Sequence, residues 1–170
     1  MCSSDLGSKS VVAVVPVEGE IVRSDDFVET LRDLRDDSGV SAVVLRVNSP
    51  GGAVAPSQEM YTAVRDLAAT KPVVASLGSV AASGGYYVAS AADEIVASPG
   101  SLTGSIGVIL SLTNMSGLLG KLGVEPDVLK AGARKDMGSP FRALSPEDRK
   151  IFQEMLDQVH GQFIEAVAAG

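Results

Sequence analysis

The chain has 170 residues, 45% of them hydrophobic, which is enough for one domain with a sizeable core. Its formal net charge of −7 argues against a nucleic-acid partner, because binding to a phosphate backbone normally requires a basic face. A single cysteine and a single histidine exclude an intrachain disulfide and any metal site built from several thiolates or imidazoles. We therefore expect a globular α/β or α+β protein.

The sequence offers no candidate membrane span, because its longest apolar run near the start, residues 11–17, is far shorter than the ~20 residues that a spanning helix needs. Residues 1–10 are small and polar, and we interpret them as a non-native or disordered leader. No repeat or linker interrupts residues 11–170, which predicts one soluble domain. The sequence stops at Gly170 within a helical pattern, which favours a fragment that lacks a C-terminal stretch.

Hydrophobic patterning predicts that strands and helices alternate over the first half of the chain. β-branched runs indicate strands, and apolar residues three or four positions apart indicate helices, the first of which Ser24 or Asp25 can cap. In chain order, the pattern predicts a strand at 11–17, a turn at 18–20, a helix ending at 36–39, a strand at 41–47, a helix at 57–69 and a strand at 73–76. This β-α-β-α-β order is typical of a largely parallel sheet covered by helices, with functional loops at the carboxyl ends of the strands.

The segment Asn48-Ser-Pro-Gly-Gly52 follows one predicted strand and precedes a predicted helix. Gly51 and Gly52 can adopt positive φ angles and direct backbone N–H groups at a ligand, as in an oxyanion hole. A tight turn between strand and helix accounts for the glycine pair equally well.

A second loop, at 78–85, places Ser83 among small residues that leave its hydroxyl room to face a substrate carbonyl. A helix is expected to begin there, so that its first free N–H groups lie beside the hydroxyl. Ser83 is therefore a candidate nucleophile, although a serine at the start of a helix more often serves as an N-cap.

A serine hydroxyl needs a base to accept its proton, and the sequence offers two kinds. His160 lies in a predicted helix that opens with Ser145-Pro-Glu-Asp148 and flanks its apolar stripe, which favours a surface position rather than a catalytic one. A lysine can serve instead, because burial disfavours its ammonium form and can lower its usual pKa of about 10.4 by several units.

Four short motifs together resemble one known family. In order they are Asn48-Ser-Pro-Gly-Gly52, Ala81-Ala-Ser-Gly-Gly-Tyr-Tyr87, Leu102-Thr-Gly-Ser-Ile-Gly-Val108 and Lys130-Ala-Gly-Ala-Arg-Lys-Asp-Met-Gly-Ser-Pro140. Each is weak alone, but their order makes a chance match improbable. From about Val11 to its end, the chain resembles the signal peptide peptidase A branch of the S49 serine peptidases, in its short bacterial form and without the C-terminal stretch.

The resemblance implies an α/β fold similar to the Clp protease and crotonase group, with repeated β-β-α or β-α units and a largely parallel sheet covered by helices. It implies that Ser83 is the nucleophile, that Lys135 is the general base and that Ser105 hydrogen-bonds the lysine. Gly52 and the backbone N–H of Gly84 correspond to the oxyanion donors, and no metal or organic cofactor is implied.

The surroundings of the implied base differ from the expected apolar setting. Arg134 and Asp136 bracket Lys135, so the fold has to supply the desolvation that a neutral amine requires. Lys130 has no matching role and is interpreted as a surface charge.

The resemblance further implies an endopeptidase that cleaves apolar peptides, such as the signal-peptide remnants left after secretion. A homo-oligomeric ring and a membrane association of full-length relatives are implied in the same way. Two other functions stay open. A crotonase-like acyl-CoA enzyme could use the same glycine-rich loops without needing both Ser83 and Lys135, and a degenerate, non-catalytic assembly module could keep the pocket without turnover.

Overall fold

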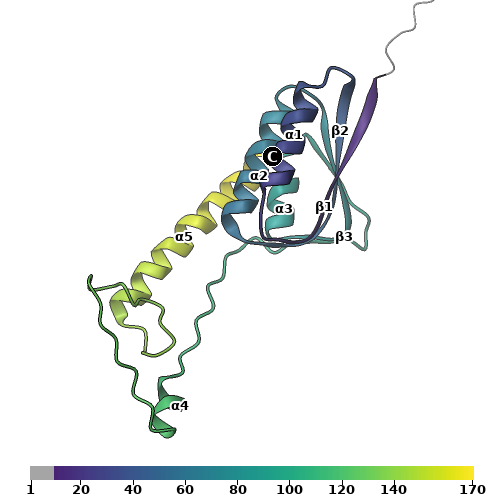
Figure 1. Ribbon diagram of the computed structural model, residues 1–170. Coiled ribbons are helices and arrows are strands. Elements are labelled where there is room, and N and C mark those ends of the chain that lie inside the picture. The colour runs from purple at the N-terminus through teal and green to yellow at the C-terminus, as the bar shows by residue number, and fades with distance from the viewer. Residues whose placement is uncertain (1–9) are drawn as a thin grey trace, which may run out of the picture. The chain divides into compact units, whose positions relative to one another are not determined.

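The computed structural model describes residues 10–170, which form two compact units (Figure 1). Within the described residues, unit 1 comprises residues 10–107 together with Phe163–Gly170, and unit 2 comprises Val108–Gln162. The predicted leader falls on residues that lie outside the described part, except for Ser10. The assignment of residues 11–170 to one domain stays a prediction.

Unit 1 contains a five-stranded sheet in which every strand pair is parallel, as the sequence predicted. The strands run in the order β1-β2-β3-β4, and β5 also pairs with β3, beyond the stretch that pairs with β4. Their bounds are β1 Val11–Ile21, β2 Val40–Gly52, β3 Val73–Ala82, β4 Glu94–Val96 and β5 Leu102–Gly104. The carboxyl ends of β2, β3 and β5 therefore lie together.

Three helices of unit 1 lie against one face of this sheet (Figure 1): α1 Asp25–Asp36, α2 Val54–Ala68 and α3 Gly84–Ala89. They enclose a core of valine, leucine and alanine side chains with little or no exposed surface. Its fully buried members include Leu31, Val43, Leu45, Val47, Val64, Leu67, Val73 and Val88. Burial of such side chains is the main favourable term in folding, so the strands that carry the site rest on a close-packed base.

Three predicted loop segments belong to strands instead. The predicted turn at 18–20 lies inside β1, where the register shifts and Gly19 adopts a φ of 69°. The segments 48–52 and 78–82 continue β2 and β3, because Ser49 pairs with Ala81 and Ala81 pairs with Thr103. Glycine and proline lower strand propensity locally, but pairing with neighbouring strands overrides it here.

Unit 2 contains α4 Ser116–Lys121 and most of α5 Pro146–Ala169, whose last turns belong to unit 1. The predicted cap of α5 is confirmed: the Ser145 hydroxyl accepts the N–H of Asp148 at 3.0 Å, and the Asp148 carboxylate accepts the N–H of Ser145 at 3.4 Å. His160 is exposed on this helix, as predicted. No helix within residues 10–170 combines the length and the hydropathy of a membrane span.

The C-terminal end of α5 packs within unit 1 on aromatic side chains. Phe163 is 5% exposed and meets the ring of Tyr87 edge to face, with ring centroids 4.8 Å apart. Tyr87 in turn meets Tyr61 at 4.8 Å. Because Tyr87 lies on α3, this cluster fixes the helix that follows Ser83.

Candidate active site

Ser83 lies at the sharp turn between β3 and α3 and has a strained backbone, with φ 50° and ψ −125°. Within residues 10–170, Ser105 is the only other non-glycine residue with a positive φ, at 54°. The Ser83 N–H donates to the carbonyl of Gly104 at 2.8 Å, and its carbonyl accepts the N–H of Tyr87 at 2.8 Å. These hydrogen bonds hold the strained turn from both sides.

The hydroxyl of Ser83 does not cap the helix. Ser83 occupies the N-cap position of α3, but its side chain makes no capping hydrogen bond, and the residue is half-buried. A strained serine at a strand-to-helix turn is the geometry by which α/β-hydrolases expose a nucleophile, and strain of this kind concentrates at functional sites. The geometry therefore favours the nucleophile interpretation over the N-cap one.

Glycines allow the ends of β2 and β3 to approach each other beside Ser83. A Cβ atom on Gly51, which has a φ of 95°, would lie 2.8 Å from the Cβ of Ser83 and 2.5 Å from the backbone nitrogen of Gly84. A Cβ atom on Gly85 would lie 2.6 Å from the carbonyl oxygen of Ser49. Any side chain at these positions would push the two segments apart, because real Cβ atoms do not approach so closely.

The two predicted oxyanion donors lie next to each other. Gly84 begins α3, so its N–H is one of the first-turn donors that have no acceptor within the helix. A Cβ atom on Gly84 would lie 3.3 Å from the backbone nitrogen of Gly52. Both glycines thus flank Ser83, and their role as donors stays a prediction.

Ser105 directly follows β5, whose pairing with β3 brings its end beside Ser83. The adjacent residue, Gly104, accepts the Ser83 N–H, so the two strained serines lie at neighbouring strand ends. The Ser105 residue is exposed. The predicted hydrogen bond from Ser105 to Lys135 stays untested.

Lys135 lies in unit 2, in a turn in which its N–H donates to the carbonyl of Gly132 at 3.2 Å. The residue is exposed within the described chain. Because Ser83 belongs to unit 1, the pairing of this lysine with Ser83 stays a prediction.

The acidic neighbour of Lys135 is engaged by other cations. Lys130 approaches Asp136 at 2.7 Å, and Arg142 donates two hydrogen bonds to the same carboxylate at 3.0 and 3.1 Å. The Arg142 guanidinium also donates to Asp148 at 2.6 Å. Lys130, interpreted above as a surface charge, is therefore one member of an ion-pair network that surrounds the lysine turn.

This network shifts the pKa values of both carboxyl groups downward. Hydrogen bonds from Arg142, and then from Lys130, hold the pKa of Asp136 well below its usual value. The Arg142 hydrogen bond likewise lowers the pKa of Asp148. Both carboxylates therefore stay ionised at neutral pH, paired with cations other than Lys135.

The side chains of Asn48 and Ser49 hold the glycine segment in place, and sequence reasoning assigned them no role. The Asn48 amide oxygen accepts the N–H of Val80 at 3.3 Å, which ties β2 to β3. The Ser49 hydroxyl lies between β1 and the glycine pair, where it donates to the carbonyl of Gly19 at 2.6 Å. Both residues belong to the motif at 48–52, but the sequence of that motif does not show which of its side chains point into the protein.

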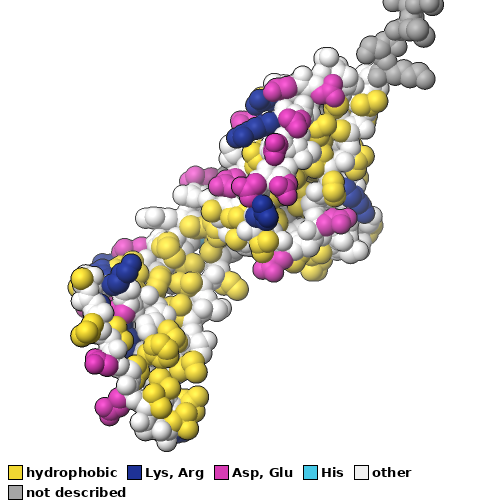
Figure 2. Space-filling view, in the orientation of Figure 1, with side chains coloured by type: hydrophobic (Ala, Val, Ile, Leu, Met, Phe, Trp, Pro, Cys, Tyr) yellow, Lys and Arg dark blue, Asp and Glu magenta, His cyan; other side chains and the backbone are white. Residues whose placement is uncertain are grey.

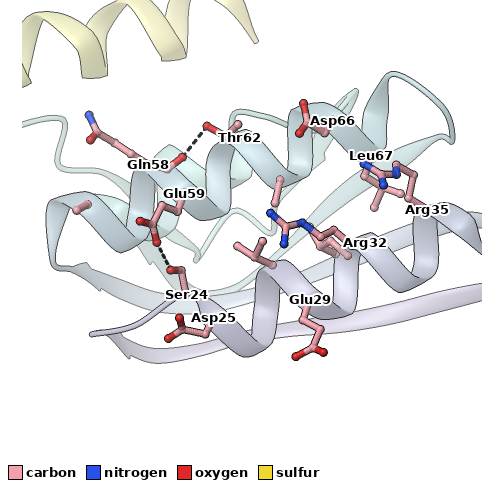
Figure 3. Close-up of a pocket in the computed structure, with 14 residues that line it drawn as sticks. Ser24, Asp25, Glu29, Arg32, Arg35, Gln58, Glu59, Thr62, Asp66 and Leu67 are labelled. Atoms are coloured by element: carbon pink, nitrogen blue, oxygen red, sulfur yellow. Dashed lines mark hydrogen bonds between the residues drawn. The ribbon is translucent and has the colours of Figure 1, made fainter.

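A pocket of about 750 Å³ lies between α1 and α2, away from these residues (Figure 3). Its polar lining includes the hydrogen-bonded pair of Ser24 and Glu59, and none of the predicted catalytic residues contributes to it. No group of histidine, cysteine or acidic side chains within residues 10–170 is arranged to hold a metal ion.

Family models match both halves of the chain. The model of peptidase family S49 matches residues 65–170, and the Clp protease model matches residues 6–101. Together with the parallel sheet, these matches identify the α/β fold as that of the Clp protease and crotonase group.

Curated relatives agree with the family models, and a solved structure agrees with the fold. The Synechocystis protein slr0021 is 47% identical over 165 residues, covering 96% of this chain and 59% of that protein. An Enterococcus faecium protein named for signal peptide peptidase SppA is 41% identical, covering 85% of this chain and 42% of its own length. The structure of the membrane-bound stomatin-specific protease 1510-N with a substrate peptide has a TM-score of 0.52 at 21% identity, covering 62% of this chain and 49% of that one.

The chain thus spans between two fifths and three fifths of these curated relatives. The S49 model alone covers more than half of the chain, including the residues from Ser83 to Lys135. The chain therefore belongs to peptidase family S49, a family of serine peptidases.

Proposed function

We propose that this chain is a serine endopeptidase in which Ser83 is the nucleophile and Lys135 is the general base. Ser83 Oγ forms a bond to the substrate carbonyl carbon while its proton passes to the neutral Lys135 amine. The N–H groups of Gly52 and Gly84 stabilise the oxyanion, and Ser105 orients the lysine. When the peptide C–N bond breaks, Lys135 returns the proton to the leaving amine. Water then hydrolyses the acyl-enzyme by the same proton transfers, and the residues named need no cofactor.

One observation carries the proposal, namely the strained turn of Ser83. Its hydroxyl makes no capping hydrogen bond and lies next to two closely packed glycines. A purely structural serine would gain from capping α3 and from a relaxed backbone, so the strain needs another purpose. Membership of the S49 family supports the same assignment.

We propose apolar extended peptides, such as signal-peptide remnants, as the substrate class. β5 ends beside Ser83 and pairs with β3 alone among the described strands, so an extended peptide could add to its other edge. The name of the Enterococcus relative supports signal peptides as the substrate class. The 1510-N structure holds a substrate peptide, which supports a peptide substrate and no narrower class. A homo-oligomeric ring and membrane association of the full-length protein remain part of this proposal.

Labelling with a fluorophosphonate tests the nucleophile and the base together. Wild-type protein should be labelled, Ser83→Ala should not, and Lys135→Ala should react at least about 100-fold more slowly, as expected when a general base is lost. Ser79→Ala and Lys121→Ala are matched controls, because Ser79 is an exposed serine of β3 and Lys121 an exposed lysine of α4. Labelling that persists in Ser83→Ala would contradict the proposal, and a folded wild type that never reacts would favour the non-catalytic module.

Mixing the two inactive variants adds a further distinction. Recovered peptidase activity would mean that one chain supplies Ser83 and another supplies Lys135. No recovery, with both variants folded, would place the pair within one chain.

A further inference from the structure

Ser49 is a buried polar residue whose hydroxyl bridges two strands beside the nucleophile. It is 0% exposed, it donates to the carbonyl of Gly19 at 2.6 Å, and it accepts the N–H of Gly51 at 3.1 Å. Because a carbonyl can only accept, the Gly19 contact fixes the hydroxyl proton and turns an oxygen lone pair toward Gly51. The hydroxyl therefore sets the orientation of the Gly51 peptide group.

Gly51 matters because it lies against the turn of Ser83. A Cβ on Gly51 would lie 2.5 Å from the backbone nitrogen of Gly84, 2.8 Å from the Cβ of Ser83 and 3.0 Å from the carbonyl oxygen of Ala82. The peptide group between Gly51 and Gly52 carries the Gly52 N–H, the proposed oxyanion donor. A change in the orientation of the Gly51 backbone would therefore move that N–H.

A pair of glycines cannot hold this geometry unaided. Glycine has wide conformational freedom, and Gly51 already adopts a φ of 95°. Stabilisation of an oxyanion requires donors that are oriented before the reaction, so some other group has to remove that freedom. Pairing of Gly51 with Glu20 and of Gly52 with Ile21 fixes one side of the segment, and the Ser49 hydroxyl binds the Gly51 N–H from within.

We propose that Ser49 is a positioning residue that orients the Gly51–Gly52 backbone for oxyanion stabilisation. It acts through the backbone and does not touch the substrate. Without its hydroxyl, the buried Gly51 N–H would lose its acceptor, and rotation of a glycine peptide group would be the cheapest way to recover one. This inference rests on the proposed function of Ser83, Gly52 and Gly84.

The test compares Ser49→Ala and Ser49→Cys with Ser90→Ala as the matched control. Ser90 is also buried, at 2% exposed, and its hydroxyl donates to the carbonyl of Tyr87 at 2.8 Å, away from the glycine segment. Each variant is assayed for its melting temperature, for the rate of fluorophosphonate labelling at Ser83, and for kcat and KM on an apolar peptide.

Ser49→Ala should slow labelling and lower kcat by about 100-fold, the lower end of the loss seen when one oxyanion donor is removed, with KM within about twofold of wild type. The thiol of Ser49→Cys is a weak donor and acceptor, so the kcat of this variant should lie between those of wild type and Ser49→Ala. It serves as the test if the alanine variant does not fold. Ser90→Ala should lower the melting temperature about as much as Ser49→Ala does. Its kcat should stay within about twofold of wild type, because the oxyanion donors keep their positions.

A folded Ser49→Ala or Ser49→Cys protein that reacts as fast as Ser90→Ala would overturn the inference. So would a loss confined to KM. Failure of the proposed function looks different, because wild-type protein would then carry no label on Ser83 and the variants would have no reference rate.

Discussion

Unit 1 and unit 2 hold their candidate catalytic side chains by different means. In unit 1, Ser83 directly follows β3, which carries the fully buried Val73 and Ala75, and backbone hydrogen bonds hold its strained turn. In unit 2, where residues 108–162 are all described, Asp148 is the one buried side chain, and Lys135 lies in a turn surrounded by ion pairs.

The two units also differ in how many apolar side chains they expose, which are coloured yellow in Figure 2. Unit 2 leaves large apolar side chains in solvent, with Leu129 95% and Ile109 89% exposed. Close packing fixes positions to a fraction of an ångström, whereas exposed ion pairs contribute little and weaken with salt. We therefore expect unit 1 to be intolerant of added volume, and unit 2 to respond mainly to charge and pH.

Gly51→Ala should have the largest effect on activity, because it adds volume where β2 approaches the turn of Ser83. Its methyl group would lie 2.5 Å from the Gly84 nitrogen, at a φ of 95° that alanine avoids. We expect peptidase activity and Ser83 labelling to be lost, and the free energy of unfolding to fall by at least about 1–3 kcal/mol from backbone strain. Denaturant titration and labelling measure both.

The matched control for that variant is Gly100→Ala, because nothing lies within 4 Å of a Cβ at Gly100 and its φ is not positive. It should leave activity and stability nearly unchanged. Near-normal activity in Gly51→Ala would show that the packing beside Ser83 is less tight than the structure has it.

Phe163→Ala should act on stability rather than on the reacting groups, and it tests the aromatic cluster that secures α3. Phe163 is 5% exposed and packs on Tyr87, so its truncation should lower the free energy of unfolding by about 3–5 kcal/mol. Ile164→Ala, at a 50% exposed neighbouring position, should cost no more than about 0.5 kcal/mol. Equal losses in the two variants, measured by denaturant titration, would argue that the end of α5 does not pack as described.

Ser105 allows a test of strain against hydroxyl chemistry. Ser105→Ala removes the hydroxyl but keeps a Cβ at a φ of 54°, whereas Ser105→Gly removes the hydroxyl and the strain together. If the hydroxyl orients Lys135, both variants should lose about tenfold in kcat, a small part of what a positioned base contributes. If kcat falls in Ser105→Ala but not in Ser105→Gly, the effect comes from backbone strain and not from the hydroxyl.

Asp136→Asn should have the smallest effect, and one that depends on pH. Pairing with Arg142 and Lys130 lowers the folded pKa of Asp136, so its stabilisation is complete above the unfolded pKa of about 4 and is lost as the pH falls below it. The wild-type melting temperature should therefore exceed that of the variant by a few degrees at pH 7, and the gap should close in acid and shrink in high salt. A gap that is constant down to pH 2 would contradict the ion-pair account.

Much of this fold could be predicted from sequence, because long β-branched runs and helical spacing carried strong signals. The parallel sheet, α1 and α5 follow from local pattern, and the cap at Ser145 follows from residue type. The extension of β2 and β3 through glycine-rich segments could not, since only pairing with neighbouring strands decides it.

The candidate site likewise has features that the sequence predicts and features that it does not. Short motifs located Ser83 and the two glycines, and the structure brings those residues together at neighbouring strand ends. The strained φ of Ser83 and the buried bridge from Ser49 to Gly19 depend on contacts between distant segments that no local pattern encodes.

Mapping of a covalent adduct tests the central claim most directly, namely that the strained serine after β3 is the nucleophile. Folded wild-type protein is treated with a β-lactone, digested and sequenced by tandem mass spectrometry. We predict one adduct per chain, on Ser83, and none on Ser79 or Ser105. An adduct on any other residue, or an unmodified Ser83 in protein that cleaves peptides, would contradict it.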